Sequence, residues 1–128
     1  MRVSPDLVVG NICLKYLNAR EARGVDISLQ LDELQEYITE LKQIFDNDEG
    51  QKQHLRYIEV YEKDILDTFA CYPDYVSIER QQDGGIIRFV VKKNYVSSLK
   101  TNLDCFVRKT SPNWLTEKIE AIEVAVDA

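Results

Sequence analysis

The sequence has little of the chemistry on which metal sites and many active sites depend. It contains one histidine, His54, and three cysteines, Cys13, Cys71 and Cys105, which lie far apart along the chain. Neither a zinc motif nor a disulfide framework is visible in that spacing. On a helix, the neighbours of His54 three and four positions away would include no carboxylate or thiol. The sequence therefore predicts no catalytic residue, no metal ligand and no cofactor, with the cysteines as small buried side chains.

Long apolar runs are also missing. No stretch approaches the ~18 apolar residues that a membrane-spanning helix needs. Residues 1–6 carry an acid and a helix-start signal where a signal peptide would need an apolar core. The 128 residues, 45% of them apolar and 30% charged, suit one globular domain over residues 1–128. We therefore expect a cytoplasmic protein with no membrane partner.

Charge is unevenly distributed along the chain. The net charge is −6, yet residues 26–72 carry twelve acidic and four basic side chains, whereas residues 73–112 carry seven basic and four acidic ones. An acidic middle is thus followed by a basic segment. Such opposite charges favour contact between the two segments, either within one molecule or between two.

The most regular pattern in the sequence is an apolar stripe with helical spacing, repeated in two neighbouring segments. The first stripe comprises Ile27, Leu31, Leu34, Ile38, Leu41 and Phe45, and the second comprises Leu55, Ile58, Ile65 and Phe69. Because such a stripe must be buried against another element, the pattern predicts two helices, about 28–46 and 51–71, packed as a long antiparallel helical hairpin. Pro73 is expected to end the second helix.

The segment before this hairpin fits two structures. Ser4, Pro5 and Asp6 form a helix-start signature, and Val9, Ile12 and Tyr16 follow at helical spacing. Apolar residues also alternate with period two in the same stretch. The sequence therefore predicts either a helix or a strand over residues 5–22.

After Pro73 the period of the apolar pattern changes from helical to alternating. Two alternating runs flank the turn sequence 83–85, Asp-Gly-Gly, which predicts a β-hairpin over about 75–92 with Ile87, Phe89 and Val91 on its apolar face. Helical spacing returns from Val96 onward and again after the Ser-Pro-Asn sequence at 111–113. The predicted fold class is therefore α+β, mainly α, with two C-terminal helices.

These patterns favour a non-catalytic interaction protein, such as a regulatory subunit, adaptor or protein inhibitor, over an enzyme. The predicted acidic partner-binding face comprises Asp32, Glu33, Glu36 and Glu40. The predicted basic patch comprises Arg80, Arg88, Lys92, Lys93 and Lys100. We expect a protein partner, a basic one included, and also consider a homodimer. The alternative is nucleic-acid binding through the basic region 80–109, which would need several cations to converge on one face.

Overall fold

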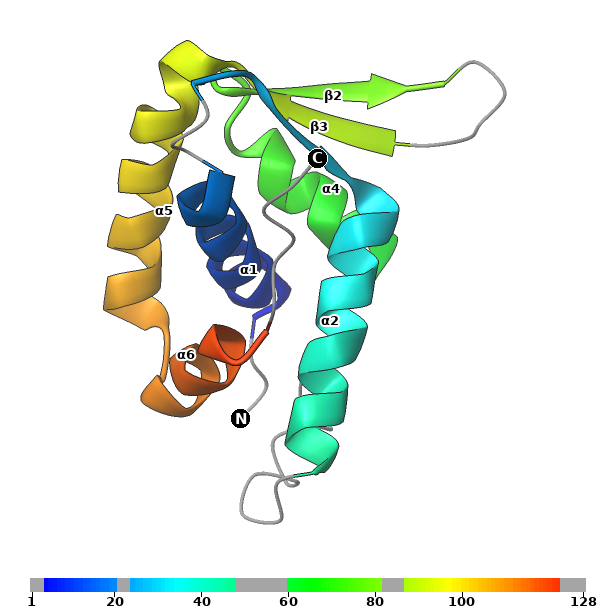
Figure 1. The fold of residues 1–128 in the computed structure, drawn as a ribbon, viewed down its shortest axis with the longest axis vertical. Coiled ribbons are helices and arrows are strands. Elements are labelled where there is room, and N and C mark those ends of the chain that lie inside the picture. The colour runs from blue at the N-terminus through cyan, green and yellow to red at the C-terminus, as the bar shows by residue number, and fades with distance from the viewer. Residues whose placement is uncertain (1–3, 21–23, 48–59, 82–86, 123–128) are drawn as a thin grey trace.

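The structure of the protein is a computed structural model that describes residues 4–20, 24–47, 60–81 and 87–122. Its elements are α1 (Pro5–Arg20), β1 (Ile27–Gln30), α2 (Leu31–Asp46), α4 (Glu62–Ala70), β2 (Val76–Arg80), β3 (Ile87–Val91), the short 3-10 helix η3 (Lys93–Tyr95), α5 (Val96–Thr110) and α6 (Asn113–Glu120). Helices predominate, and a small antiparallel sheet lies at one end of the molecule (Figure 1). The predicted class, α+β and mainly α, is confirmed.

The helix α1 lies at the centre of the fold. It packs against α2, α4, α5 and α6, and Figure 1 shows α5 on one side of α1 and α2 on the other. Its buried residues form an almost continuous run, Leu7–Cys13, followed by Tyr16 and Leu17. A helix that is apolar on all sides matches a helical and an alternating pattern equally well. That is why the sequence is compatible with both structures over residues 5–22, and the structure shows a helix over Pro5–Arg20, the described part of this range.

The three strands form one sheet in the order β1-β3-β2. β2 pairs with β3 in antiparallel register from Val76 opposite Val91 to Arg80 opposite Ile87, while the predicted turn 83–85 lies outside the described residues. The apolar face of β3 is buried, and the ring of Phe89 stacks on that of Phe69 in α4 at 4.1 Å between centroids. Helices therefore cover this inner face of the sheet.

The predicted long helical hairpin is wrong in its boundaries. Residues 27–30 form strand β1, because Ile27 pairs with Val91 and Leu29 with Phe89. In the second arm the backbone at Tyr61 is extended, and α4 begins only at Glu62. Residues 51–59 lie outside the described part of the chain. The helix does end before Pro73, as predicted.

The apolar stripe of α2 is buried, but not mainly against α4. Leu31, Leu34, Ile38 and Leu41 are all buried in the core. The most extensive contacts of α2 among the described residues are with α1, α6, β1 and β3. The stripe therefore joins a shared core around α1 rather than a two-helix rod.

Two of the three cysteines lie on the surface, which corrects the prediction that all are buried. Cys13 on α1 is buried, whereas Cys71, just after α4, and Cys105, on the outer side of α5, are exposed. Burial raises the pKa of the Cys13 thiol to about 12, so this side chain behaves as a neutral apolar group.

No helix in the described part of the chain has both the length and the apolar character needed to cross a membrane.

Candidate functional site

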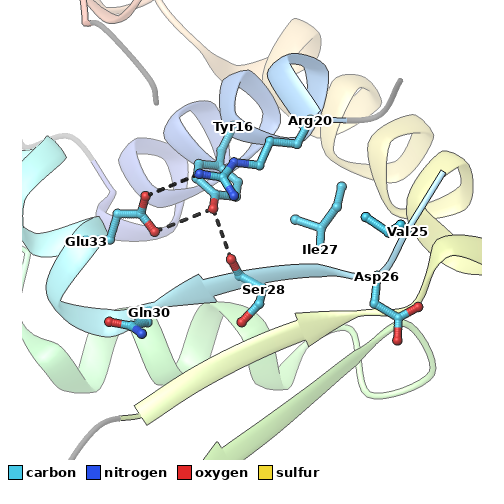
Figure 2. A pocket seen from close by; sticks show the side chains of 8 residues that line it. All are labelled: Tyr16, Arg20, Val25, Asp26, Ile27, Ser28, Gln30 and Glu33. Carbon is cyan, nitrogen blue, oxygen red and sulfur yellow. Dashed lines mark hydrogen bonds and ion pairs between the residues drawn. The ribbon is translucent and has the colours of Figure 1, made fainter. Parts of the chain in front are cut away.

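A pocket opens where the C-terminal half of α1 passes over β1 and the start of α2 (Figure 2). Its volume is about 280 Å³. Its polar lining comprises Tyr16, Arg20, Asp26, Ser28, Gln30 and Glu33. These side chains come from α1, β1 with the residue before it, and α2, which follow one another along the chain. The sequence did not show the pocket, because the strand β1 and the way α1 packs over it are not visible there.

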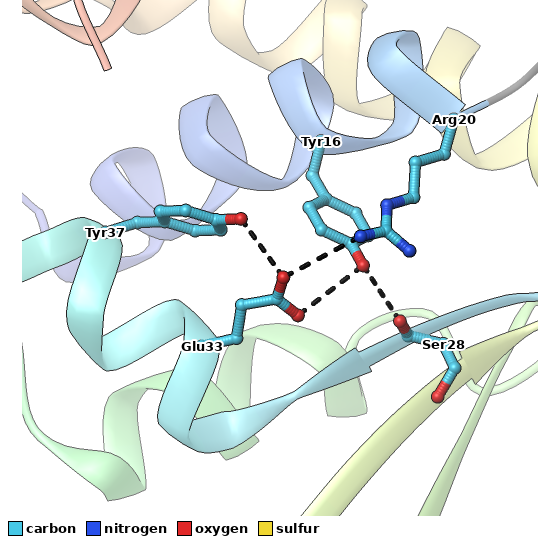
Figure 3. A network of polar contacts seen from close by, with 5 residues as sticks. All are labelled: Tyr16, Arg20, Ser28, Glu33 and Tyr37. Carbon is cyan, nitrogen blue, oxygen red and sulfur yellow. Dashed lines mark hydrogen bonds and ion pairs between the residues drawn. The ribbon is translucent and has the colours of Figure 1, made fainter. Parts of the chain in front are cut away.

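A set of polar contacts, here called the Tyr16 network, crosses this pocket (Figure 3). Tyr16 donates its O–H to the backbone carbonyl of Ser28 at 2.9 Å, and its oxygen lies 3.5 Å from the Glu33 carboxylate. Tyr37 donates to the other Glu33 oxygen at 3.1 Å. The guanidinium of Arg20 lies 3.9 Å from Glu33 and 4.5 Å from the centroid of the Tyr16 ring. The network thus joins α1, β1 and α2.

The electrostatics of the network hold Tyr16 in its neutral form. Burial is the largest cause that raises the pKa of Tyr16, and the nearby Glu33 carboxylate raises it further, while Arg20 opposes the shift. The hydroxyl therefore remains a hydrogen-bond donor at neutral pH. Its partners are a backbone carbonyl and a carboxylate already held by Tyr37 and Arg20. This geometry supports a structural clamp.

No group of three His, Cys, Asp or Glu side chains gathers as a metal site in the ranges that the structure describes.

The Tyr16 network also closes one edge of the sheet. In an antiparallel ladder the N–H and C=O of one residue point to the same side, and successive residues point to opposite sides. The Ser28 carbonyl bonds to Tyr16, so it points away from β3, and Ile27 and Leu29 supply the bonds to β3. The Tyr16 hydroxyl of α1 therefore binds an outward-pointing backbone carbonyl of β1, that of Ser28.

The opposite edge of the sheet is built differently. The backbone N–H and C=O groups of Ile87, Phe89 and Val91 point toward β1. Those of Arg88 and Val90 therefore point toward β2. On β2, the backbone groups of Ser77 and Glu79 then point toward β3. Those of Val76, Ile78 and Arg80 point away from β3, toward the outer side of the strand. The bond from the Val76 N–H to the Tyr72 carbonyl, 3.0 Å, agrees with this alternation. We call this outward side of β2 the β2 edge.

The β2 edge is exposed to solvent. Residues 77–80 are all exposed, and no strand among the described residues pairs with β2 on this side. Figure 1 shows β2 at the outer rim of the molecule. Leu29 and Ile78 both lie opposite Phe89, but Leu29 is 3% exposed and Ile78 is 39% exposed. The inner face of the sheet is thus covered at β1, whereas at β2 it is covered at Val76 and partly open at Ile78.

The predicted acidic face is only partly available for a partner. Asp32 and Glu36 are exposed on α2, and Glu40 is partly exposed. Glu33 belongs to the Tyr16 network and holds Tyr37 and Arg20. The sequence does not separate Glu33 from its neighbours, because Tyr16 and Arg20, which contact it, belong to another helix.

The residues of the predicted basic patch do not form one cluster. Arg80 and Arg88 line a small pocket at one end of the sheet, where Arg88 forms an ion pair with Glu79 at 2.6 Å. Lys92 follows the other end of β3, about 13 Å from Arg88 at ~3.3 Å per residue, and Lys93 comes next at the start of η3. Lys100 lines a separate pocket with Asp104 and Arg108. The nucleic-acid alternative, which needs convergent cations, stays a prediction.

Comparisons with models of known protein families, with curated proteins and with solved structures find no match for this chain. The site must therefore be interpreted from its own geometry. Sequence reasoning missed strand β1 and with it the difference between the two edges of the sheet. The available signal is the short alternation of Ile27, Ser28, Leu29 and Gln30, which the predicted helix 28–46 overlaps.

Proposed function

We propose that the protein is a non-catalytic interaction protein whose protein partner adds an extended strand to the β2 edge. The observation that carries this proposal is the contrast between the two edges of the sheet. The outward backbone of β1 is engaged by Tyr16, whereas Ile78 and Arg80 turn their backbone groups toward solvent beside an exposed apolar side chain. Strand addition to an exposed sheet edge is a common mode of peptide recognition.

The residues of β2 define which strand would fit. The backbone groups of Ile78 and Arg80 would pair with any extended chain, so they supply affinity without selecting a sequence. Selectivity would come from the side chains: Ile78 favours an apolar residue opposite it, and Arg80 favours a neutral or acidic one. Glu79 is already paired with Arg88 and contributes little selectivity.

The acidic side chains of α2 provide a second surface that supports the same function. Asp32 and Glu36 are exposed on this helix. Like-signed carboxylates of this kind speed the approach of a basic partner and are sensitive to salt. They would act on the rate of association, whereas the β2 edge would hold the bound strand.

The proposal is tested by a matched pair of substitutions. Ile78→Lys places a charge on the β2 edge, and Val25→Lys places one at another exposed apolar side chain, 55% exposed, near β1. The immobilised wild type and both variants are exposed to extract from the native cells. We expect a protein that is retained by the wild type and by Val25→Lys and lost with Ile78→Lys, because an edge charge blocks strand addition.

Hydrogen exchange then locates the contact. With the captured protein purified, its addition should slow exchange of the outward amides of Ile78 and Arg80 and leave that of Ser77 unchanged, since Ser77 already faces β3. Equal retention by Ile78→Lys, or protection confined to α2, would contradict the proposal. Circular dichroism of each variant shows that the fold is intact.

A further inference from the structure

We infer that the strand that fits the β2 edge is β2 of a second copy of this chain, paired antiparallel about a two-fold axis at Ile78. The inference rests on the proposed function and names its partner. Pairing β2 with its own copy extends the three-stranded sheet into a continuous six-stranded one in the order β1-β3-β2-β2-β3-β1. Hydrogen bonding, charge and apolar burial each support this partner.

Hydrogen bonding limits the possible registers. Two strand edges pair only when residues whose backbone groups point outward lie opposite each other. In a β2–β2 pair, each of Val76, Ile78 and Arg80 must therefore lie opposite one of these three residues of the other copy. With Ile78 at the axis, each Ile78 N–H bonds to the Ile78 carbonyl of the other copy. Each Arg80 N–H then bonds to the Val76 carbonyl of the other copy, which is compatible with the bond from the Val76 N–H to Tyr72.

Charge selects among these registers. With Glu79 at the axis, two Glu79 carboxylates lie directly opposite each other, and with Arg80 at the axis two guanidinium groups do so. Like charges directly opposite in an antiparallel pair are destabilising. With Ile78 at the axis, Ser77 lies opposite Glu79 and Val76 opposite Arg80, so no like charges face each other. The charge pattern of β2 therefore disfavours the registers centred on Glu79 and Arg80 and is compatible with the one centred on Ile78. A register centred on Ser77 would pair Val76 with Ile78 and would need the Val76 N–H, which is already bonded to Tyr72.

Apolar burial favours the register centred on Ile78. The two Ile78 side chains would meet on the inner face of the sheet, beside the Phe89 rings that lie opposite them on β3. This contact covers the apolar rim that one copy leaves uncovered. Glu79 keeps its ion pair with Arg88 on the outer face. Because a five-residue strand buries well below the ~1,200 Å² of a standard interface, the dimer should be weak and concentration-dependent.

The first measurement is sedimentation of the purified protein over a concentration series from about 1 µM to about 1 mM, the range in which weak association is visible. The mass should rise from 14.9 kDa toward twice that value. Ile78→Lys should weaken self-association about tenfold or more, because it buries an uncompensated charge at the axis. Val25→Lys, away from the axis, should associate as the wild type does.

The second measurement determines the register. Single cysteines replace Ile78, Glu79 or Arg80 in a background with Cys71→Ser and Cys105→Ser, which removes the exposed native thiols. Only residues at the axis come close enough to their own copies to form a disulfide. We expect oxidation to cross-link Ile78→Cys and not Glu79→Cys or Arg80→Cys. Preferential cross-linking of either other variant would overturn the proposed register.

The outcomes separate this inference from the proposed function. A wild type that stays monomeric throughout the series overturns the second-copy partner, while capture of a different protein that depends on Ile78 would still support strand addition. Self-association that Ile78→Lys does not weaken overturns the Ile78-centred dimer. Absence of both self-association and Ile78-dependent capture overturns both proposals.

Discussion

At the scale of single residues, Tyr16 links three elements through one hydroxyl. Its ring lies under Arg20, and its O–H reaches the Ser28 carbonyl while lying near Glu33. Only Arg20 follows Tyr16 closely in the sequence, whereas Ser28 and Glu33 belong to the elements that come next. The contribution of the hydroxyl can be measured without disturbing the packing of the ring.

Removing this hydroxyl should destabilise the protein and change how its stability depends on pH. Tyr16→Phe should lower the free energy of unfolding by about 1 kcal/mol at pH 7, the typical value of one hydrogen bond. The pKa of Tyr16 is raised above its ordinary value of 10.0, so above pH 10 the unfolded chain loses this proton while the folded chain retains it. The stability of the wild type therefore falls above pH 10.

Urea unfolding at pH 7 and at pH 10–11 checks both expectations. The pKa values of Cys13 and Tyr72 are also raised, chiefly by burial, and they act with the same sign in both proteins. The difference between wild type and Tyr16→Phe therefore isolates Tyr16. Tyr95→Phe, at an exposed tyrosine, is the control and should change stability little. A constant difference across this pH range would contradict the proton linkage.

The sequence shows which acidic residues lie on α2, but it does not show which of them are held by other side chains. It placed Asp32, Glu33, Glu36 and Glu40 together as one exposed face, and the exposure of Asp32 and Glu36 agrees. It could not separate Glu33 from the others, because the hydroxyls and the guanidinium that hold Glu33 come partly from another helix. Ile78 lies within the predicted β-hairpin 75–92, but the sequence does not show its exposure, since exposure at an edge depends on strand order.

At the scale of elements, α1 and α5 meet at a glycine, Gly10. A Cβ atom on Gly10 would lie 3.6 Å from the Phe106 ring and 3.8 Å from Leu103, which are ordinary contact distances. The helix thus has room for a methyl group at this position and for nothing much larger. Gly24 differs, because its φ of 66° lies in the left-handed region that other residues rarely adopt.

Substitutions at the two glycines should act in opposite directions. Gly10→Ala should raise the free energy of unfolding by about 0.5–1 kcal/mol, since alanine favours an interior helical position over glycine. Gly10→Leu should lower it, because the added atoms would meet Phe106. Gly24→Ala should also lower it, by about 1 kcal/mol, through backbone strain. Urea denaturation measures the free energy of unfolding of all three variants. A lower value for Gly10→Ala would contradict the room for a methyl group between α1 and α5.

The elements that sequence reasoning missed are those defined by distant partners. Ile27 stands four residues before Leu31, so it fits a helical stripe as well as a strand. What makes it a strand residue is the pairing with Val91, more than sixty positions away. The β2 and β3 strands were visible in the sequence because they are local partners.

At the scale of the whole molecule, side chains from all the larger elements contribute to one core. Buried residues of α1, α2, α4, α5, α6 and the sheet belong to a single apolar cluster, and Trp114 on α6 packs against it. The predicted single domain implies that these elements unfold together. A core substitution in one helix should then be detected from another.

Leu34→Ala tests this cooperativity. Leu34 is fully buried on α2, so its truncation should cost about 2–5 kcal/mol. The fluorescence of Trp114 reports on α6, and far-ultraviolet circular dichroism reports on all helices. Both signals should shift to the same lower urea midpoint, whereas the exposed control Gln35→Ala should leave it nearly unchanged. A tryptophan transition that does not move would indicate independently folding units.

Tyr16 binds the outward backbone of β1, whereas the β2 edge is exposed. This difference limits how many molecules can join through the sheet. A sheet that accepts strands at both sides can recruit molecules without end, as amyloid fibrils do. Within the described residues, a tyrosine from the central helix engages the outward backbone of β1, so under the proposed function the sheet has one edge for strand addition. Once two molecules pair through their β2 edges, neither has a free β2 edge left. Assembly by strand addition would therefore stop at the dimer.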